Sequence, residues 1–374
     1  MTMTRPAKDR VADASSATAR IDSRAVQTAD AADTKSAHLL NSLPNRRGIA
    51  YWSACAITLL LVTIAVLRIV FHDGTHLLTW LNAFTRYVYL PAYVCLAWTA
   101  WKRHWFLAFI NLTVICLHLV WLAPDYMRDR RFDSVGSGIA TAAVEATSVR
   151  IFFANVNGAN TEYQALLDEI RDANPDVIEL VEFSPNWQRA FLRSPTIAAY
   201  PYGGGRRHAS METVSVFSKL PLKSEKRDWV VGREIETVTV PVGSKTLRVV
   251  GLHSPRPMDS HGGDGVDDYD AFWNYTIPML RTDKGPLVVV GDCNATQYSL
   301  VYKRITADRL RSAHEDRGRG YATTWPNGYY PFPPIRIDQA FLSPEVECLS
   351  IREGTGHGSD HKPLILDVRI RGEE

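Results

Sequence analysis

Two polar side chains, Asp292 and Asn294, stand directly after the apolar run 287–290, whose β-branched bias predicts a buried strand. Residues two apart on a strand point to the same face, so a carboxylate and a carboxamide are expected side by side at its end. A carboxylate accepts a proton from water, and an amide NH₂ donates to an anionic oxygen. The pair therefore suits hydrolysis of a phosphate ester, although GDxN by itself is more often only a strand followed by a turn.

Polar residues also end other predicted strands. Asn155 closes the first strand after residue 148, and Glu182 closes the strand 176–182. A carboxylate at the end of a strand with a buried interior is a candidate ligand of a hard cation. His253 ends a further strand, where a structural role is the more common alternative.

The C-terminal part of the chain adds Asp338 on a strand and the pair Asp360 and His361 in a Gly-rich loop. An Asp and a His from separate loops can pair, and the Asp then fixes the imidazole tautomer and favours its protonated form beside an anion. For the basic loop 203–208, a solvated surface loop is the alternative to a contact with substrate. The candidates for substrate binding are Arg206, Arg256 and Trp325.

The elements that must position these residues are strands and helices in alternation. The alternation begins near Arg150 and predicts a soluble α/β domain over 148–371, long enough to bury a substantial core. Residues 150–374 hold 27 of the 42 Lys and Arg residues and 30 of the 40 Asp and Glu residues. This slight acidic excess does not favour a strongly basic nucleic-acid surface. The five cysteines show neither a disulfide framework nor zinc-site spacing.

The preceding half of the chain predicts attachment to a membrane. Residues 1–46 have almost no large apolar side chains and are expected to form a disordered polar tail. Residues 47–125 are expected to form a transmembrane region with three helices. Buried core helices are the alternative, but these are normally shorter and amphipathic. The three apolar runs are 48–67, 77–101 and 105–124.

Residues 126–147 are small and weakly patterned, which predicts a linker. Basic residues flank the first apolar run and separate the second from the third, which predicts that both flanks face the cytoplasm. Three spans would then place the domain 148–371 outside the cytoplasm. Arginines after the third run point the other way. The basic residues concerned are Arg46, Arg47, Lys102 and Arg103 for the first orientation, and Arg128, Arg130 and Arg131 for the second.

Six motifs taken in order resemble those of the endonuclease/exonuclease/phosphatase superfamily of metal-dependent phosphoesterases. They are NVNG, LVE, LHSP, GDCN, RID and SDH. Each is weak alone, but six in order, each at a strand end or in an adjoining loop, are specific. The resemblance implies an α/β (α+β) fold, a four-layer sandwich of two mixed β-sheets flanked by helices, with the site at one rim. It does not cover residues 1–145, although helices before such a domain are similar to those of bacterial membrane-anchored members.

The resemblance also implies a metal site. Glu182 would be the principal ligand of Mg²⁺, with Mn²⁺ as the alternative ion. Asn155 would assist at the metal and orient the site, and Asp360 would lie near it and help to position the histidine. Mg²⁺ keeps several waters and needs few protein carboxylates, which agrees with one clear Glu ligand.

The same resemblance implies catalytic roles. Asp292 would orient or deprotonate the attacking water, and Asn294 would hold the phosphate or the nucleophile. Asp338 would pair with His361, which would contact the scissile phosphate. His253 occupies the place of a His in the deoxyribonuclease-like and sphingomyelinase-like branches, whereas the apurinic-endonuclease branch has a Tyr there.

The sequence therefore predicts a membrane-anchored, Mg²⁺-dependent phosphoesterase whose partners are the lipid bilayer and a phosphate-ester substrate. A nuclease is the first hypothesis. The second is a phosphodiesterase or phosphatase that acts on phospholipid, sphingomyelin or phosphoinositide head groups, because tethering brings the domain to lipid substrates. The third is a non-catalytic membrane-anchored binding module, against which the intact set of motifs argues. No protein partner can be inferred.

Overall fold

The computed structural model describes residues 46–128, 148–203, 210–257, 265–282, 284–318, 321–328 and 330–371. The chain divides into two units, residues 1–59 and 60–374. The described part of the first unit is the beginning of helix α2. Three predictions concern residues that are not described. They are the polar tail up to residue 45, most of the linker and the candidate Arg206.

Two helices of the described chain are long and apolar enough to cross a bilayer, which takes about 20 residues. They are α2 (Arg46–Phe71) and α6 (Trp105–Tyr126). The prediction of three such helices is wrong, because the second apolar run is broken into short pieces. These pieces are α3 (His76–Ala83), α4 (Thr85–Val88) and α5 (Leu90–Trp101).

Polar side chains account for the break between α3 and α4. The Thr85 hydroxyl donates to the carbonyl of Asn82 at 2.6 Å, and the Asn82 amide donates to the carbonyl of His72 at 3.0 Å. Side-chain bonds of this kind compete with the helical ladder, and Pro91 then stands near the start of α5, where proline is tolerated. The expectation that the domain lies outside the cytoplasm depended on three crossings and loses that support.

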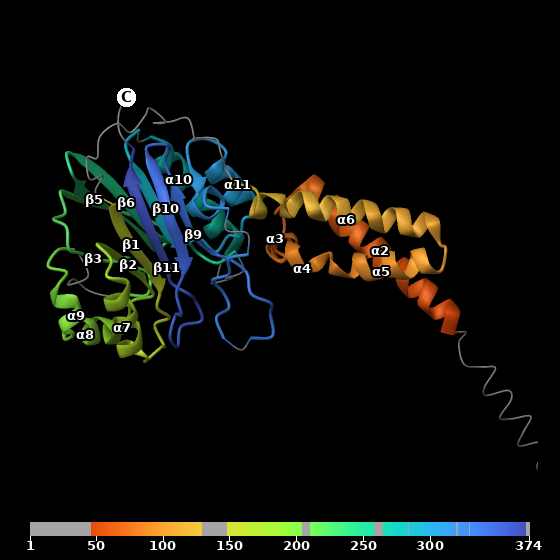
Figure 1. The fold of residues 1–374 in the computed structure, drawn as a ribbon, viewed down its shortest axis with the longest axis horizontal. Coiled ribbons are helices and arrows are strands. Elements are labelled where there is room, and N and C mark those ends of the chain that lie inside the picture. Colours follow the sequence, from red (N-terminus) through yellow and green to blue (C-terminus); the bar gives the residue numbers. More distant parts are fainter. Residues whose placement is uncertain are drawn as a thin grey trace, which may run out of the picture. The chain divides into compact units, whose positions relative to one another are not determined.

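The strands form two mixed sheets, as predicted (Figure 1). In the first sheet the order is β10-β11-β1-β2-β3, and in the second it is β4-β5-β6-β7-β9-β8. The pairs β1/β2 and β6/β7 are parallel, and all other pairs are antiparallel. The bounds in the first sheet are β1 Ser148–Asn155, β2 Val177–Val181, β3 Ser215–Ser218, β10 Val346–Glu353 and β11 Leu364–Ile370. Those in the second are β4 Ser224–Val230, β5 Arg233–Val242, β6 Lys245–His253, β7 Leu287–Asp292, β8 Arg311–Ser312 and β9 Asp338–Leu342.

Helices cover the outer face of each sheet, which completes the four layers (Figure 1). Helices α7 (Tyr163–Ala173), α8 (Pro185–Leu192) and α9 (Pro195–Ala198) pack on the first sheet. Helices α10 (Gly265–Thr282) and α11 (Leu300–Thr306) pack on the second, and the short α12 (Ala313–Asp316) precedes β9. Between the sheets lies a core of Val, Leu and Ile side chains, each worth about 1.5–3 kcal/mol when fully buried.

Strand register brings the predicted polar residues to one rim of the sandwich. His253 at the end of β6 is paired with Asp292 at the end of β7, and Asp292 is paired with Asp338 at the start of β9. In the first sheet, Asn155 at the end of β1 is paired with Val181, the last residue of β2. The pairing and direction of the strands therefore bring these polar residues, which are far apart in the sequence, close together.

Candidate active site

Asn155 connects the two sheets at this rim. Its side-chain amide donates to Glu182 Oε1 at 3.0 Å and to Asp292 Oδ2 at 3.1 Å. Its Oδ1 accepts from the backbone N–H of Asn157 at 3.0 Å, which fixes the end of the amide that faces the carboxylates. A neutral donor therefore holds both carboxylates in place without cancelling their charge.

Three site residues have a left-handed backbone. The φ angles of Asn157, Glu182 and Asn294 are 53°, 54° and 45°. Asparagine tolerates this region, whereas for a residue such as glutamate it costs on the order of 1–2 kcal/mol. The turn at Glu182 ends β2 and leaves the carboxylate against Asn155. Backbone strain of this kind is often kept at functional sites.

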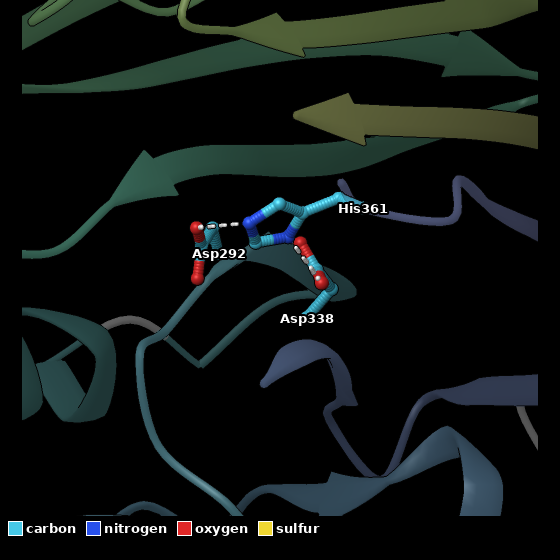
Figure 2. A group of neighbouring side chains, drawn as sticks. All are labelled: Asp292, Asp338 and His361. Carbon is cyan, nitrogen blue, oxygen red and sulfur yellow. Dashed lines mark hydrogen bonds and ion pairs between the residues drawn. The ribbon is translucent and has the colours of Figure 1, made fainter. Parts of the chain in front are cut away.

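His361 lies between two carboxylates (Figure 2). Its Nδ1 is 2.9 Å from Asp338 Oδ2, and its Nε2 is 3.7 Å from Asp292 Oδ2. Two hydroxyl groups hold the arrangement. Ser359 Oγ donates to the carbonyl at the end of β1 at 2.8 Å and accepts from the backbone N–H of His361. Thr324 Oγ1 accepts from the backbone N–H of Asp338. The imidazole is therefore fixed in both position and orientation.

Burial and neighbouring charges set the protonation of the site. Burial alone would lower the pKa of His361, but the charges of Asp338 and Asp292 raise this pKa to about 10. Burial raises the pKa of Asp292 to about 7, against the opposing charge of His361. For His253, burial and the positive charge of Arg233 hold the pKa well below its ordinary value. Near neutral pH the imidazole of His361 is therefore cationic and that of His253 is neutral, and the carboxyl group of Asp292 is close to the midpoint of its titration.

Oxygen atoms on the Glu182 side of the site fit a hard cation. The ligand atoms of Asp292, Asp338 and His361 lie within 4.8 Å of one another, but a protonated imidazole has no free nitrogen to offer a metal. Mg²⁺ prefers oxygen ligands and keeps several waters. The side chain of Glu182 is 26% exposed, so an ion there could retain its water, with Asn155 and Asp292 close by.

The predicted residues surround a single cavity of about 630 Å³. Asn155 and Asp338 lie behind its lining and support Glu182 and His361 through hydrogen bonds. The six motifs thus meet in one cleft, which a shared catalytic site requires. The predicted residues that border it are Glu182, His253, Arg256, Asp292, Asn294, Trp325, Asp360 and His361.

Asp360 borders the cavity and is hydrogen-bonded to two neighbouring segments. Its Oδ1 accepts from the side-chain amide of Asn157 at 2.9 Å, and its Oδ2 accepts from the indole N–H of Trp325 at 3.2 Å. Both oxygen atoms therefore hold neighbouring loops. These bonds position Trp325, and the place of Asp360 near the metal stays a prediction.

Sequence reasoning missed one wall of the cavity. Thr79, Trp80 and Ala83 of α3 border it, as do Phe84, which follows α3, and Arg233 at the start of β5. An apolar run that was predicted to lie in lipid gives no sign of which side chains face a protein cavity. For Arg233, the only available signal was a charged residue at the start of a strand, which is common.

Comparison with known proteins agrees with the geometry. The sequence profile of the Endonuclease/Exonuclease/phosphatase family matches residues 153–361. None of the curated proteins compared with the chain matches it. Similar solved structures include a humanized TDP2 from D. rerio, with 14% identity and a TM-score of 0.49 over 59% of this chain and 99% of that one. Proteins of this family from Beutenbergia cavernae (18% identity, TM-score 0.45, 60% and 72% coverage) and Bacteroides vulgatus (18%, 0.46, 60% and 99%) are also similar.

Proposed function

Because the chain belongs to the endonuclease/exonuclease/phosphatase family, whose members are typically metal-dependent phosphoesterases, we propose that it hydrolyses phosphate esters with Mg²⁺. The observation that carries this proposal is the meeting of three groups at one cavity. A cationic His361 paired with Asp338, a carboxyl group at Asp292 and a carboxylate at Glu182 lie together there.

Each group has a place in the reaction. Phosphate esters resist hydrolysis because their negative charge repels nucleophiles, so added positive charge lowers the barrier. His361 donates a hydrogen bond from Nε2 to a phosphate oxygen, and Asp338 keeps the ring oriented and protonated. Asp292, with its pKa near 7, accepts a proton from the attacking water. Glu182, with Asn155 beside it, would hold the cation, which when bound neutralises charge on the phosphate.

We also propose that α2 and α6 anchor the protein in a membrane. Their candidate spans, Gly48–Phe71 and Trp105–Tyr126, contain 24 and 22 residues. This length suits a bilayer. A reporter fused after residue 374, active on only one side of the membrane, determines on which side the domain lies. Purification of the protein from the soluble fraction without detergent would contradict the anchor.

Hydrolysis of bis(p-nitrophenyl) phosphate by the full chain in detergent tests the chemistry. We expect hydrolysis with Mg²⁺, its loss in EDTA, and a decrease of at least about 100-fold in Glu182→Gln. Glu347→Gln is the matched control, because Glu347 pairs with Arg369 at 2.6 Å on the strands β10 and β11, away from the cavity. If neither this ester nor any nucleic acid or lipid is hydrolysed, a non-catalytic binding module becomes the better assignment.

A further inference from the structure

The ends of both candidate spans are bonded to loops that surround the cavity. Asp125, in the last turn of α6, accepts from the hydroxyl of Tyr298 at 2.5 Å. Asp73, two residues after α2, accepts from the backbone N–H of Leu300 at 2.5 Å. His76 Nδ1, at the start of α3, is 2.9 Å from the carbonyl of Pro257. If these helices cross a bilayer, the cavity therefore lies at its surface.

Helix α3 supplies an aromatic wall to this cavity. The ring of Trp80 lies 5.0 Å from that of Phe84 and 5.1 Å from that of Phe332, measured between centroids. Phe84 packs with Ile335 and Ile337, the segment that leads into β9. The wall is thus continuous with the catalytic domain and borders the same space as the phosphoesterase residues.

A second set of bonds holds this wall in place. The Tyr87 hydroxyl in α4 donates to the carbonyl of Pro334 at 2.7 Å and lies 2.8 Å from the hydroxyl of Tyr321. Phe332, which contacts Trp80, and Leu77 of α3 expose large apolar side chains. Aromatic and apolar side chains grouped near the ends of spanning helices are typical of the membrane interface.

We propose that the cavity takes the head group of an anionic phospholipid, with Trp80 as a specificity-determining residue against the part of the lipid next to the phosphate. This assignment rests on the proposed function. A cavity of about 630 Å³ suits one small ligand, and residues of α3 line part of it. Arg233 and Arg256 border the cavity and complement an anionic head group. In the reaction, the oxygen of water bonds to phosphorus and one P–O ester bond breaks. Asp292 takes up a proton from the water, the leaving oxygen takes up a proton from solvent, and Asp292 then returns its proton to solvent.

The test compares three substrates on the full chain with Mg²⁺. They are phosphatidylcholine vesicles that contain phosphatidylglycerol, labelled DNA in single- and double-stranded form, and bis(p-nitrophenyl) phosphate. Cleavage of lipid is read by ³¹P NMR. We expect a new phosphate signal from the phosphatidylglycerol vesicles and none in EDTA. In Trp80→Ala, kcat/KM should fall about 10-fold more for the lipid than for bis(p-nitrophenyl) phosphate, as expected for one lost pocket contact.

Two further variants keep the outcome decisive. Ala83→Leu narrows the cavity without removing the ring and should also reduce lipid hydrolysis, which replaces Trp80→Ala if that variant fails to fold. Trp229→Ala removes an exposed indole on β4 and should leave all rates unchanged. Hydrolysis of bis(p-nitrophenyl) phosphate and DNA but not of lipid overturns the lipid assignment and leaves the proposed function standing. Equal losses on lipid and soluble ester overturn the role of Trp80, and hydrolysis of nothing overturns both proposals.

Discussion

The carboxylate of Asp125 accepts a hydrogen bond from the hydroxyl of Tyr298, and the guanidinium of Arg86 lies 2.8 Å from the same oxygen. The side chain of Asp125 is fully buried, so its charge depends on these two partners. Tyr298 follows Asn294 by four residues. An acidic side chain on a candidate membrane helix therefore holds the loop that carries one of the proposed catalytic residues.

Tyr298→Phe should weaken both stability and turnover. It removes one hydrogen bond to a charged, buried group, which costs about 1.5–3 kcal/mol in the free energy of unfolding. The loop 294–300 then loses its side-chain bond to the end of α6, so kcat should fall while KM changes little. Thermal unfolding and steady-state kinetics measure the two effects.

Tyr275→Phe is a matched control for that variant. The Tyr275 hydroxyl also donates to an aspartate, Asp228, at 3.1 Å, but it is exposed and does not border the cavity. An equal kcat in Tyr298→Phe and Tyr275→Phe would show that the bond to Asp125 stabilises the protein without positioning the site.

Glu182→Gln and His361→Ala should each abolish hydrolysis while the fold remains. Glu182 is proposed to hold the cation, so a higher Mg²⁺ concentration should restore part of the activity of Glu182→Gln. His361 acts on the phosphate, so Mg²⁺ should not restore His361→Ala. Rates at increasing Mg²⁺, with circular dichroism as a check on folding, separate the two. A wild-type-like rate in either purified variant would refute its assignment.

The pH dependence of kcat/KM should be bell-shaped. Asp292 must be ionised to accept a proton, so activity should rise as pH passes through the pKa of this group, about 7. His361 must be protonated, so activity should fall as pH passes through its pKa, about 10. A bound cation favours the carboxylate and moves the acidic limb to lower pH.

Asp338→Asn tests the origin of the alkaline limb. The charge of Asp338 is the main cause that raises the pKa of His361, so its removal should shift this limb to lower pH. A pH–rate profile of the variant measures the shift. An unchanged alkaline limb would mean that another group titrates there.

Glu179 predicts a separate effect on stability. It lies in the core, and neither of its carboxyl oxygens has a hydrogen-bond partner among the described residues. Burial, together with the charge of Glu236, raises the pKa of Glu179 well above its ordinary value. The unfolded chain releases this proton near the ordinary pKa of about 4.5, whereas the native protein keeps it. The contribution of Glu179 to the free energy of unfolding is therefore complete below that pH and is lost as pH rises toward the folded pKa.

Glu179→Gln should therefore become more stable than the wild type as pH increases. The gain should be about 1.4 kcal/mol for each pH unit between the unfolded and the folded pKa. Burial also raises the pKa of Glu236 to about 7, despite Arg227, so part of the wild-type slope should remain in the variant. Denaturant unfolding at several pH values measures both. A constant difference between the two proteins would mean that Glu179 is ionised in the native state.

The strands and their polar ends were predictable because local patterns determine them. Apolar runs with β-branched residues became β1, β2, β6 and β7, and the polar residue after each run arrived at the rim through parallel pairing. The order of six motifs then implied the two-sheet sandwich. His253 and Asp292 lie side by side because β6 and β7 run parallel and end at the same edge of their sheet.

Contacts between distant segments were not predictable. The apolar run 77–101 has the composition of a spanning helix, but hydrogen bonds made by Asn82 and Thr85 break it. Asp360 stands in a motif, yet its oxygens are engaged by Asn157 and Trp325. Both outcomes depend on which partner happens to lie nearby in three dimensions, and single-sequence patterns do not contain that information.

The left-handed backbone at Glu182 has a consequence for directed evolution. Glycine adopts this conformation freely, so Glu182→Gly would relieve the steric penalty and increase the free energy of unfolding. The same exchange would delete the carboxylate on which the proposed chemistry depends. A library selected only for thermal stability would therefore enrich inactive variants at position 182. Such a selection must also measure activity.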